Sequence, residues 1–283
     1  MKTRIKNLPV STNKTEKELA FLQDLFIAPD WGERFAELID EHVELPQEGK
    51  VLYLAAGTGG HALALHEKAN GKLEFVCLDE NYECVQLARA KAVAANDQLS
   101  FQTGKVDELA FPDNHFKLVV ANASLLATNR INQLLNEMVR VTAPGGTVAL
   151  ALPTASSFGE FFSIYWEALH NSGLMDHEAD VEHLITEIST VSQIEQLAEQ
   201  EGLDDIATWT RVEEFDYDSG EQFLNSPLVA EFLLRNWLAS VPEELRMQVA
   251  NEVSRIINEE RHEAEFALSV KATLLIGRKT HSH

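Results

Sequence analysis

The sequence predicts an open α/β fold with a mostly parallel sheet and helices on both of its faces. Short, nearly continuous apolar runs alternate with helical patterns between residues 50 and 153, which is typical of βαβ units with right-handed crossovers. A glycine-rich turn joins the first apolar run to the helix that follows it. The 283 residues are 45% hydrophobic and 24% charged, a composition that excludes collagen-like and wholly disordered proteins.

Two short helices are expected before the first strand. Apolar residues recur at helical spacing over residues 15–43, and Pro29 with Asp30 forms a helix-start signal inside that stretch. We therefore expect one helix before Pro29 and a second helix after it. This N-terminal helical region is assigned to residues 1–44, and the α/β domain to residues 45–283.

The strands of the α/β domain are expected in a regular order. Apolar runs predict five of them at residues 50–56, 73–79, 99–104, 116–123 and 145–153, and two more at 206–217 and 266–279. Helical patterns cover residues 80–96 and 131–142 between these strands, and 156–170, 181–200, 220–240 and 242–263 after Pro153. The segments at about 155–200 and 219–264 are expected to cap the ligand-binding edge of the sheet.

The charge balance argues against polyanionic partners. Lys and Arg number 23 against 45 for Asp and Glu, so the net charge is −22 and binding to nucleic acid or acidic membranes is disfavoured. Residues 176–265 hold 23 of the acidic residues and five arginines. That segment is interpreted as a solvated helical face, with an acidic docking surface as the alternative.

The two cysteines and the N-terminus bear on location. Cys77 and Cys84 lack the Cys/His spacing of a zinc site, which favours a reduced cytoplasmic protein with neither structural disulfide nor metal. Pro9 and the polar residues after it leave no apolar signal region, and no run approaches the length of a membrane span. We expect a small-molecule substrate and allow for a homodimer.

The glycine turn marks the expected ligand site. Gly57, Gly59 and Ala62 satisfy the GxGxxG/A pattern, and Asp79 ends the second strand 20 residues after Gly59. In an open α/β sheet ligands bind beyond the carboxyl ends of the strands, where backbone N–H groups can face a pyrophosphate and a carboxylate can accept ribose hydroxyls. A nicotinamide dinucleotide is one ligand that fits this pattern.

Several segments together resemble the class I S-adenosyl-L-methionine-dependent methyltransferases, especially the small-molecule branch with the quinone-biosynthesis enzymes. They are VLYLAAGTGG, LDENYECVQLARAKA, LAFPDNHFKLVVANASLL and VRVTAPGGTVALALP. The resemblance covers roughly residues 15–155. It implies a Rossmann-like sheet of seven strands with an antiparallel last strand, and S-adenosylmethionine as the cofactor.

The resemblance also implies which residues bind the cofactor. They are Ala55, Gly57, Thr58 and Gly59 in the glycine turn, Asp79 and Glu80 at the second strand, Val106 and Asp107 beside adenine, and Asn122 after the fourth strand. Three positions depart from the family pattern. Tyr53 stands where the family has an acidic residue, Ala55 replaces its first loop glycine, and Lys105 replaces the usual acceptor of the adenine amino group. Val106 N–H can still serve adenine N1, and Asp107 or Glu108 can substitute for the missing acceptor.

No catalytic residue is assigned, because a sulfonium methyl needs alignment and exclusion of water more than it needs acid–base chemistry. His61 and His115 are the nearest candidate bases by position, and each is also interpreted as an ordinary polar residue. Phe158, Phe161, Phe162, Tyr165 and Trp166 suit either an apolar acceptor pocket or core packing.

Three functions follow from these observations. The first is methyl transfer to a small, apolar or neutral acceptor at oxygen or carbon. The second is a catalytically inactive binding or interaction module, which the departures at Tyr53, Ala55 and Lys105 favour. The third is a nicotinamide-dependent oxidoreductase, which only the glycine spacing and Asp79 favour.

Overall fold

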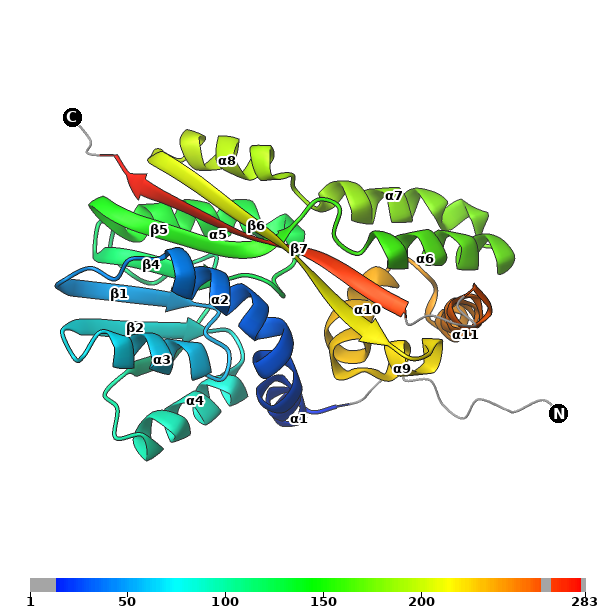
Figure 1. The fold of residues 1–283 in the computed structure, drawn as a ribbon, viewed down its shortest axis with the longest axis horizontal. Coiled ribbons are helices and arrows are strands. Elements are labelled where there is room, and N and C mark those ends of the chain that lie inside the picture. The colour runs from blue at the N-terminus through cyan, green and yellow to red at the C-terminus, as the bar shows by residue number, and fades with distance from the viewer. Residues whose placement is uncertain (1–13, 261–265, 281–283) are drawn as a thin grey trace. The chain divides into compact units, whose positions relative to one another are not determined.

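A seven-stranded sheet organises the chain in the computed structural model, which describes residues 14–260 and 266–280 (Figure 1). The strands are β1 Gly49–Leu54, β2 Leu73–Asp79, β3 Ser100–Thr103, β4 Phe116–Asn122, β5 Thr142–Thr154, β6 Leu203–Tyr217 and β7 Phe266–Lys279. Their order is β3-β2-β1-β4-β5-β7-β6; β1 to β5 pair in parallel and β7 runs antiparallel. The predicted fold class is confirmed.

Helical segments connect and follow the strands. They are α1 Glu16–Leu22, η1 Gln23–Gly32, α2 Glu33–His42, α3 Gly60–Lys68, α4 Tyr82–Ala94, η2 Thr128–Arg130, α5 Ile131–Val141, α6 Gly159–Asn171, η3 Met175–His177, α7 Glu178–Glu187, α8 Val191–Gln200, α9 Gly220–Asn225, η4 Leu228–Leu233, α10 Leu234–Trp237 and α11 Glu243–Glu260. Within the part of the chain that is described, none of these helices is long and apolar enough to cross a bilayer.

The described part of the chain divides into two compact units. The sheet unit comprises residues 14–154, 189–211 and 272–280, and the helical unit comprises the described residues 155–188, 212–260 and 266–271. The sheet unit therefore holds all of β1 to β5 and the glycine turn. The domain boundary at residue 44 and the capping role of the later helices remain predictions.

Alternating side chains of β1 cover both faces of the sheet. Leu52 and Leu54 are fully buried in a core with Leu134 of α5 and Ile194 of α8. On the opposite face, Tyr53 contacts the first turn of α3. A strand with apolar side chains on both faces of the sheet needs helices covering both faces. The nearly continuous apolar runs in the sequence predicted this arrangement.

The N-terminal helices do not separate at Pro29. The structure has one continuous run through α1, η1 and α2, with Pro29 inside the π-helical η1, so the expected break is wrong. Proline lacks the N–H of the helical ladder and its ring crowds the preceding turn, and a π-helical segment accommodates such local irregularity. Burial of Ile27 and Trp31 on either side of the proline stabilises the run despite the lost hydrogen bond.

Residues 181–200 also differ from expectation, because two helices replace one. Thr190 ends the extended connection and begins α8, where its hydroxyl accepts from Gln193 N–H at 3.2 Å while the Gln193 side chain accepts from Thr190 N–H at 2.8 Å. This reciprocal capping box makes the break stable. Amphipathic periodicity alone did not reveal it.

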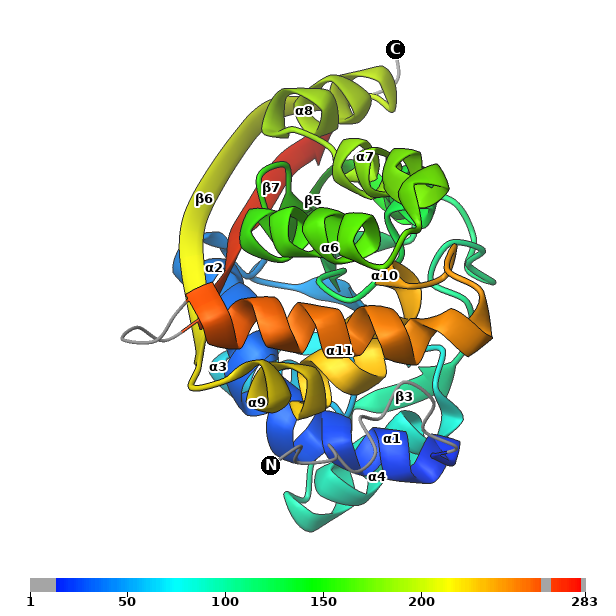
Figure 2. The ribbon, with the colours of Figure 1, turned by 90° about the vertical axis from the view of Figure 1, so that its right-hand side faces the viewer.

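The aromatic cluster forms the core of the helical unit. Phe161 stacks on Trp237 with ring centroids 4.1 Å apart and contacts Phe223 at 5.8 Å. Phe158, Phe162 and Tyr165 are buried as well. Figure 2 shows α6, which carries the cluster, alongside α11, and Asn171 of α6 donates to Glu252 of α11. Core packing, one of the two interpretations of the cluster, therefore accounts for these side chains in this unit.

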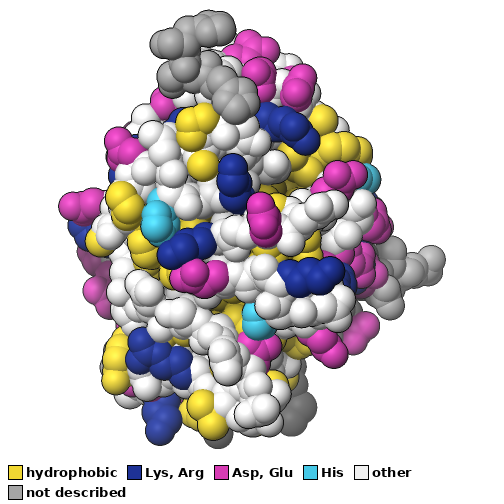
Figure 3. Space-filling model, turned by 90° about the vertical axis from the view of Figure 1, so that its left-hand side faces the viewer, with side chains coloured by type: hydrophobic (Ala, Val, Ile, Leu, Met, Phe, Trp, Pro, Cys, Tyr) yellow, Lys and Arg dark blue, Asp and Glu magenta, His cyan; other side chains and the backbone are white. Residues whose placement is uncertain are grey.

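Charged side chains are mixed on the face drawn in Figure 3. Lys and Arg lie among Asp and Glu there and do not merge into a continuous basic area. A surface that binds polyanions needs clustered positive charge, and this face does not have such a cluster.

Candidate functional site

The glycine turn between β1 and α3 adopts left-handed backbone conformations. The φ angles are 52° at Ala55, 55° at Gly57 and 80° at Gly59. A Cβ on Gly59 would lie 2.8 Å from the Ala88 side chain of α4, so this position requires glycine for packing as well as for conformation. Ala55 adopts the left-handed region without being glycine, at a cost of about 1 kcal/mol.

Asp79 anchors the turn from the end of β2. Its Oδ2 accepts from Gly57 N–H at 2.7 Å, and its Oδ1 accepts from Asn81 N–H at 2.9 Å. Burial raises the pKa of Asp79, while these backbone hydrogen bonds act in the opposite direction. A carboxylate offers about four acceptor positions, so Asp79 retains capacity for ligand hydroxyls.

Arg130 joins two acidic residues next to this anchor. Its guanidinium donates to both oxygens of Asp107 at 2.7 Å and to Glu80 Oε2 at 2.9 Å. The hydrogen bonds from Arg130 lower the pKa of both carboxyl groups. Val106 N–H, the expected partner of adenine N1, donates to Glu80 Oε1 at 3.2 Å.

The N-terminal segment covers the glycine turn. The Gln23 amide nitrogen lies 2.8 Å from where a Cβ on Gly57 would be, and Gln23 Oε1 accepts from Cys84 Sγ at 3.2 Å. Asp24 accepts from the Thr58 hydroxyl at 2.5 Å and pairs with Lys91 of α4. Sequence reasoning missed Gln23, Asp24 and Lys91. The available signal was a pair of adjacent polar residues within an otherwise apolar helical pattern.

Tyr53 takes part in a chain of hydrogen bonds that links β1 to α3 and α2. Its hydroxyl lies 2.7 Å from His61 Nδ1, and His61 Nε2 lies 3.2 Å from Asp40 Oδ1. Burial lowers the pKa of His61. Because both ring nitrogens are engaged, His61 is not placed to serve as a general base for an acceptor.

The remaining candidates lie at different places in the fold. Asn122 ends β4, where its Oδ1 accepts from Ser124 N–H at 3.3 Å and its amide donates to Gly32 O at 3.4 Å. His115 is exposed just before β4, at the opposite strand end from Asn122. Lys105 is exposed and pairs with Glu108 at 2.8 Å.

The structure thus brings most of the expected cofactor residues to one edge. The glycine turn, Asp79 and Asn122 follow the carboxyl ends of β1, β2 and β4, and these strands are neighbours in the sheet. Glu80, Val106 and Asp107 meet through the contacts of Arg130 and Glu80. Sequence reasoning did not identify Arg130.

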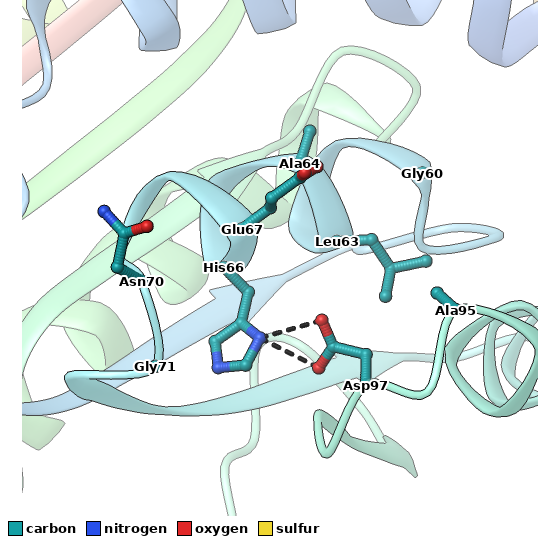
Figure 4. Close-up of a pocket in the computed structure, with 9 residues that line it drawn as sticks. All are labelled: Gly60, Leu63, Ala64, His66, Glu67, Asn70, Gly71, Ala95 and Asp97. Carbon is teal, nitrogen blue, oxygen red and sulfur yellow. Dashed lines mark hydrogen bonds and ion pairs between the residues drawn. The ribbon is translucent and has the colours of Figure 1, made fainter.

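A pocket of about 580 Å³ lies along the flank of α3 (Figure 4). His66 Nδ1 is 2.9 Å from Asp97 Oδ2 inside it, and none of its lining residues belongs to the expected cofactor set. Within residues 14–260 and 266–280, no group of three or more His, Cys, Asp or Glu side chains is arranged to hold a metal ion.

Comparisons with known proteins find methyltransferases among the proteins similar to this chain. Residues 51–146 match the family model described as a methyltransferase domain. A demethylmenaquinone methyltransferase of Renibacterium salmoninarum is 30% identical over 136 residues, 48% of this chain and 54% of the relative. One from Deinococcus radiodurans is 32% identical over 146 residues, 50% of this chain and 59% of the relative. The chain spans between half and three-fifths of these relatives' lengths.

Solved structures agree on the fold. The YcgJ protein of Bacillus subtilis has a TM-score of 0.57 at 18% identity, over 88% of this chain and 100% of that one. A methyltransferase-like structure from Bacillus halodurans has a TM-score of 0.55 at 17% identity, over 88% and 100%. Residues 51–146 therefore resemble a methyltransferase domain, and over about half of its length the chain is similar to demethylmenaquinone methyltransferases.

Proposed function

We propose that this chain transfers the methyl group of S-adenosylmethionine to a small, apolar or neutral acceptor, at oxygen or carbon. The observation that carries the proposal is Asp79, a buried carboxylate that is hydrogen-bonded to the glycine turn. Burial of a carboxylate costs free energy unless its oxygens are hydrogen-bonded, so such groups are often found at functional sites. Ribose hydroxyls are the ligands that the resemblance to the family implies at this position.

Five residues of the site have assigned roles in this proposal. Asp79 accepts the ribose hydroxyls, and Gly57 and Gly59 allow the backbone to approach the methionyl part closely. Val106 N–H serves adenine N1, and Asp107 accepts from the adenine amino group. When bound, the cofactor supplies a methyl group that its sulfonium charge already activates. The protein then has to align the acceptor and exclude water.

The proposed acceptor is apolar, with a quinone-related ring as the first class to test. Two relatives are named for demethylmenaquinone, which supports that class.

A non-catalytic binding module is the second candidate. It is favoured by the chain's own side chains at the site: Gln23 lies against Gly57, and Glu80 accepts the hydrogen bond from Val106. Tyr53 and Lys105 also remove two of the family's polar anchors. Nothing beyond the glycine spacing and Asp79 favours a nicotinamide cofactor.

Calorimetry with the whole chain tests the proposal. We expect S-adenosylhomocysteine to bind at micromolar concentration, and Asp79→Asn to weaken binding at least tenfold, because the neutral amide is a poorer acceptor of two hydroxyls. Asp97→Asn is the matched control, since Asp97 lies in the separate pocket on α3. Absence of binding at millimolar concentration contradicts the enzyme assignment, and a response to NAD alone would favour the oxidoreductase.

A further inference from the structure

We propose that Glu80 competes with adenine for Val106 N–H and so lowers the affinity for the nucleoside, and that Arg130 is the positioning residue that holds Glu80 there. This inference rests on the proposed function, because it assumes an adenosyl ligand. It assigns to Glu80 a role opposite to that of its neighbour Asp79. Asp79 favours binding of the nucleoside, and Glu80 opposes it.

The competition follows from the hydrogen-bonding capacity of one backbone group. Val106 is buried, and its N–H donates to Glu80 Oε1 at 3.2 Å. A backbone N–H is a single donor, so adenine N1 can accept from it only when the Glu80 carboxylate leaves. A carboxylate is a stronger acceptor than an uncharged ring nitrogen, which makes the exchange unfavourable at that atom.

Arg130 keeps Glu80 in the competing position. The guanidinium donates to Glu80 Oε2 at 2.9 Å and to both Asp107 oxygens at 2.7 Å, so one cation fixes two acidic side chains. Without this cation the two carboxylates would repel each other and separate. Arg130 thereby orders Glu80, although only Glu80 contacts the backbone group in question.

The arrangement has a consequence for turnover. In the absence of nucleoside the buried Val106 N–H is already satisfied, which avoids the cost of an unpaired buried donor. Binding of the nucleoside requires displacement of Glu80, which costs free energy. The affinity is therefore lower than it would be if Val106 N–H were unoccupied. We expect the pair Glu80 and Arg130 to weaken binding of the demethylated product and to speed its release.

The test compares affinities of the whole chain for S-adenosylhomocysteine by calorimetry. Glu80→Ala is expected to tighten binding about tenfold, and Glu80→Gln by a smaller factor because the amide oxygen still accepts. Glu74→Ala removes an exposed acidic side chain near the start of β2, at the opposite end of that strand from Glu80, and is expected to leave the affinity unchanged. Thermal unfolding of each variant verifies that the fold is retained.

A second ligand isolates the atom in question. For an analogue of S-adenosylhomocysteine with C–H in place of adenine N1, Glu80→Ala is expected to change the affinity less than twofold, since this ligand cannot accept from Val106. Arg130→Gln is expected to tighten binding of S-adenosylhomocysteine, and Arg130→Lys to return it toward the wild-type value. In the Glu80→Ala background, Arg130→Gln should not tighten binding further.

The outcomes separate the two proposals. If the wild-type chain binds S-adenosylhomocysteine and Glu80→Ala leaves the affinity unchanged or weakens it, the competition is wrong while the proposed function stands. An equal gain for the N1-lacking analogue also overturns the competition. If neither the wild type nor Glu80→Ala binds at millimolar concentration, both proposals fail.

Discussion

The two ends of the proposed cofactor site differ in how their polar groups are held, although Asp79 and Glu80 are adjacent in the sequence. Asp79 accepts from the backbone N–H groups of Gly57 and Asn81, and burial raises its pKa. Glu80 is partly exposed and pairs with Arg130, which lowers its pKa. The ribose end is thus held by hydrogen bonds from backbone N–H groups. The adenine end is held by an ion pair between side chains, which substitution of either residue can remove.

The glycine turn offers the largest effect with which to test this comparison. Gly59→Ala should lower the free energy of unfolding by about 2–4 kcal/mol, because a Cβ would overlap α4 and Phe101 at a left-handed position. Gly57→Ala, whose Cβ would meet only the flexible Gln23 side chain, should cost less. Urea denaturation measures both. Equal losses would show that the turn is not packed as described.

The opposite pKa shifts predict how binding depends on pH. Only ionised Asp79 accepts strongly from two hydroxyls, and its pKa is raised, so affinity for S-adenosylhomocysteine should fall up to tenfold per pH unit below that pKa. The pair of Glu80 and Arg130 should persist to lower pH, since the Glu80 pKa is lowered. Calorimetry from neutral pH downward checks this, and the decline should be absent in Asp79→Asn.

The same shifts have opposite consequences for stability. The folded state binds the Asp79 proton more tightly than the unfolded chain does, so this group lowers the free energy of unfolding as pH rises from the ordinary aspartate pKa through the raised one. The contribution of Glu80 is present above the ordinary glutamate pKa and is lost as pH falls through the lowered one. Asp79→Asn and Glu80→Gln should therefore alter the pH profile of unfolding in opposite directions.

Removal of the cation at the adenine end should have a modest effect on stability. Arg130→Ala should lower the free energy of unfolding by about 1 kcal/mol, since its ion pairs with Glu80 and Asp107 are only partly buried and are screened by solvent. Chemical denaturation at low and high salt measures the loss, which should shrink as salt rises. Lys105→Ala, at an exposed pair, should show no comparable change. A loss of several kcal/mol would contradict this prediction, because it would mean that Arg130 stabilises more of the fold than its two ion pairs.

The smallest effect concerns the departure at Ala55. Ala55→Gly should raise the free energy of unfolding by about 0.5 kcal/mol, because relief of the left-handed backbone outweighs the added freedom of the unfolded chain. Ala90→Gly, at an exposed position of α4, is the matched substitution and should lower it by about 1 kcal/mol. Destabilisation of equal size at both positions would contradict the assigned backbone conformation.

Much of the fold could be predicted from local patterns. The strands at residues 73–79 and 266–279 occur as expected, since strand periodicity and flanking turn residues are read over a few positions. The continuity of the helical run through Pro29 could not be predicted, because burial of Trp31 against Phe35 outweighs the local cost of proline. The break before α8 was missed because amphipathic spacing continued across the Thr190 cap.

Residues 50–153 determined the α/β fold, the glycine turn and the position of Asp79 through their order alone, because consecutive βαβ units place the carboxyl ends of their strands at one edge. The contacts of Gln23 with the turn, of Arg130 with Glu80 and Asp107, and of Tyr53 with His61 and Asp40 depended on the folded chain. Several of these partners are dozens of residues apart, and side-chain hydrogen bonds leave no periodic signal in a sequence. Folding therefore decided which polar groups of the site remain available to a ligand.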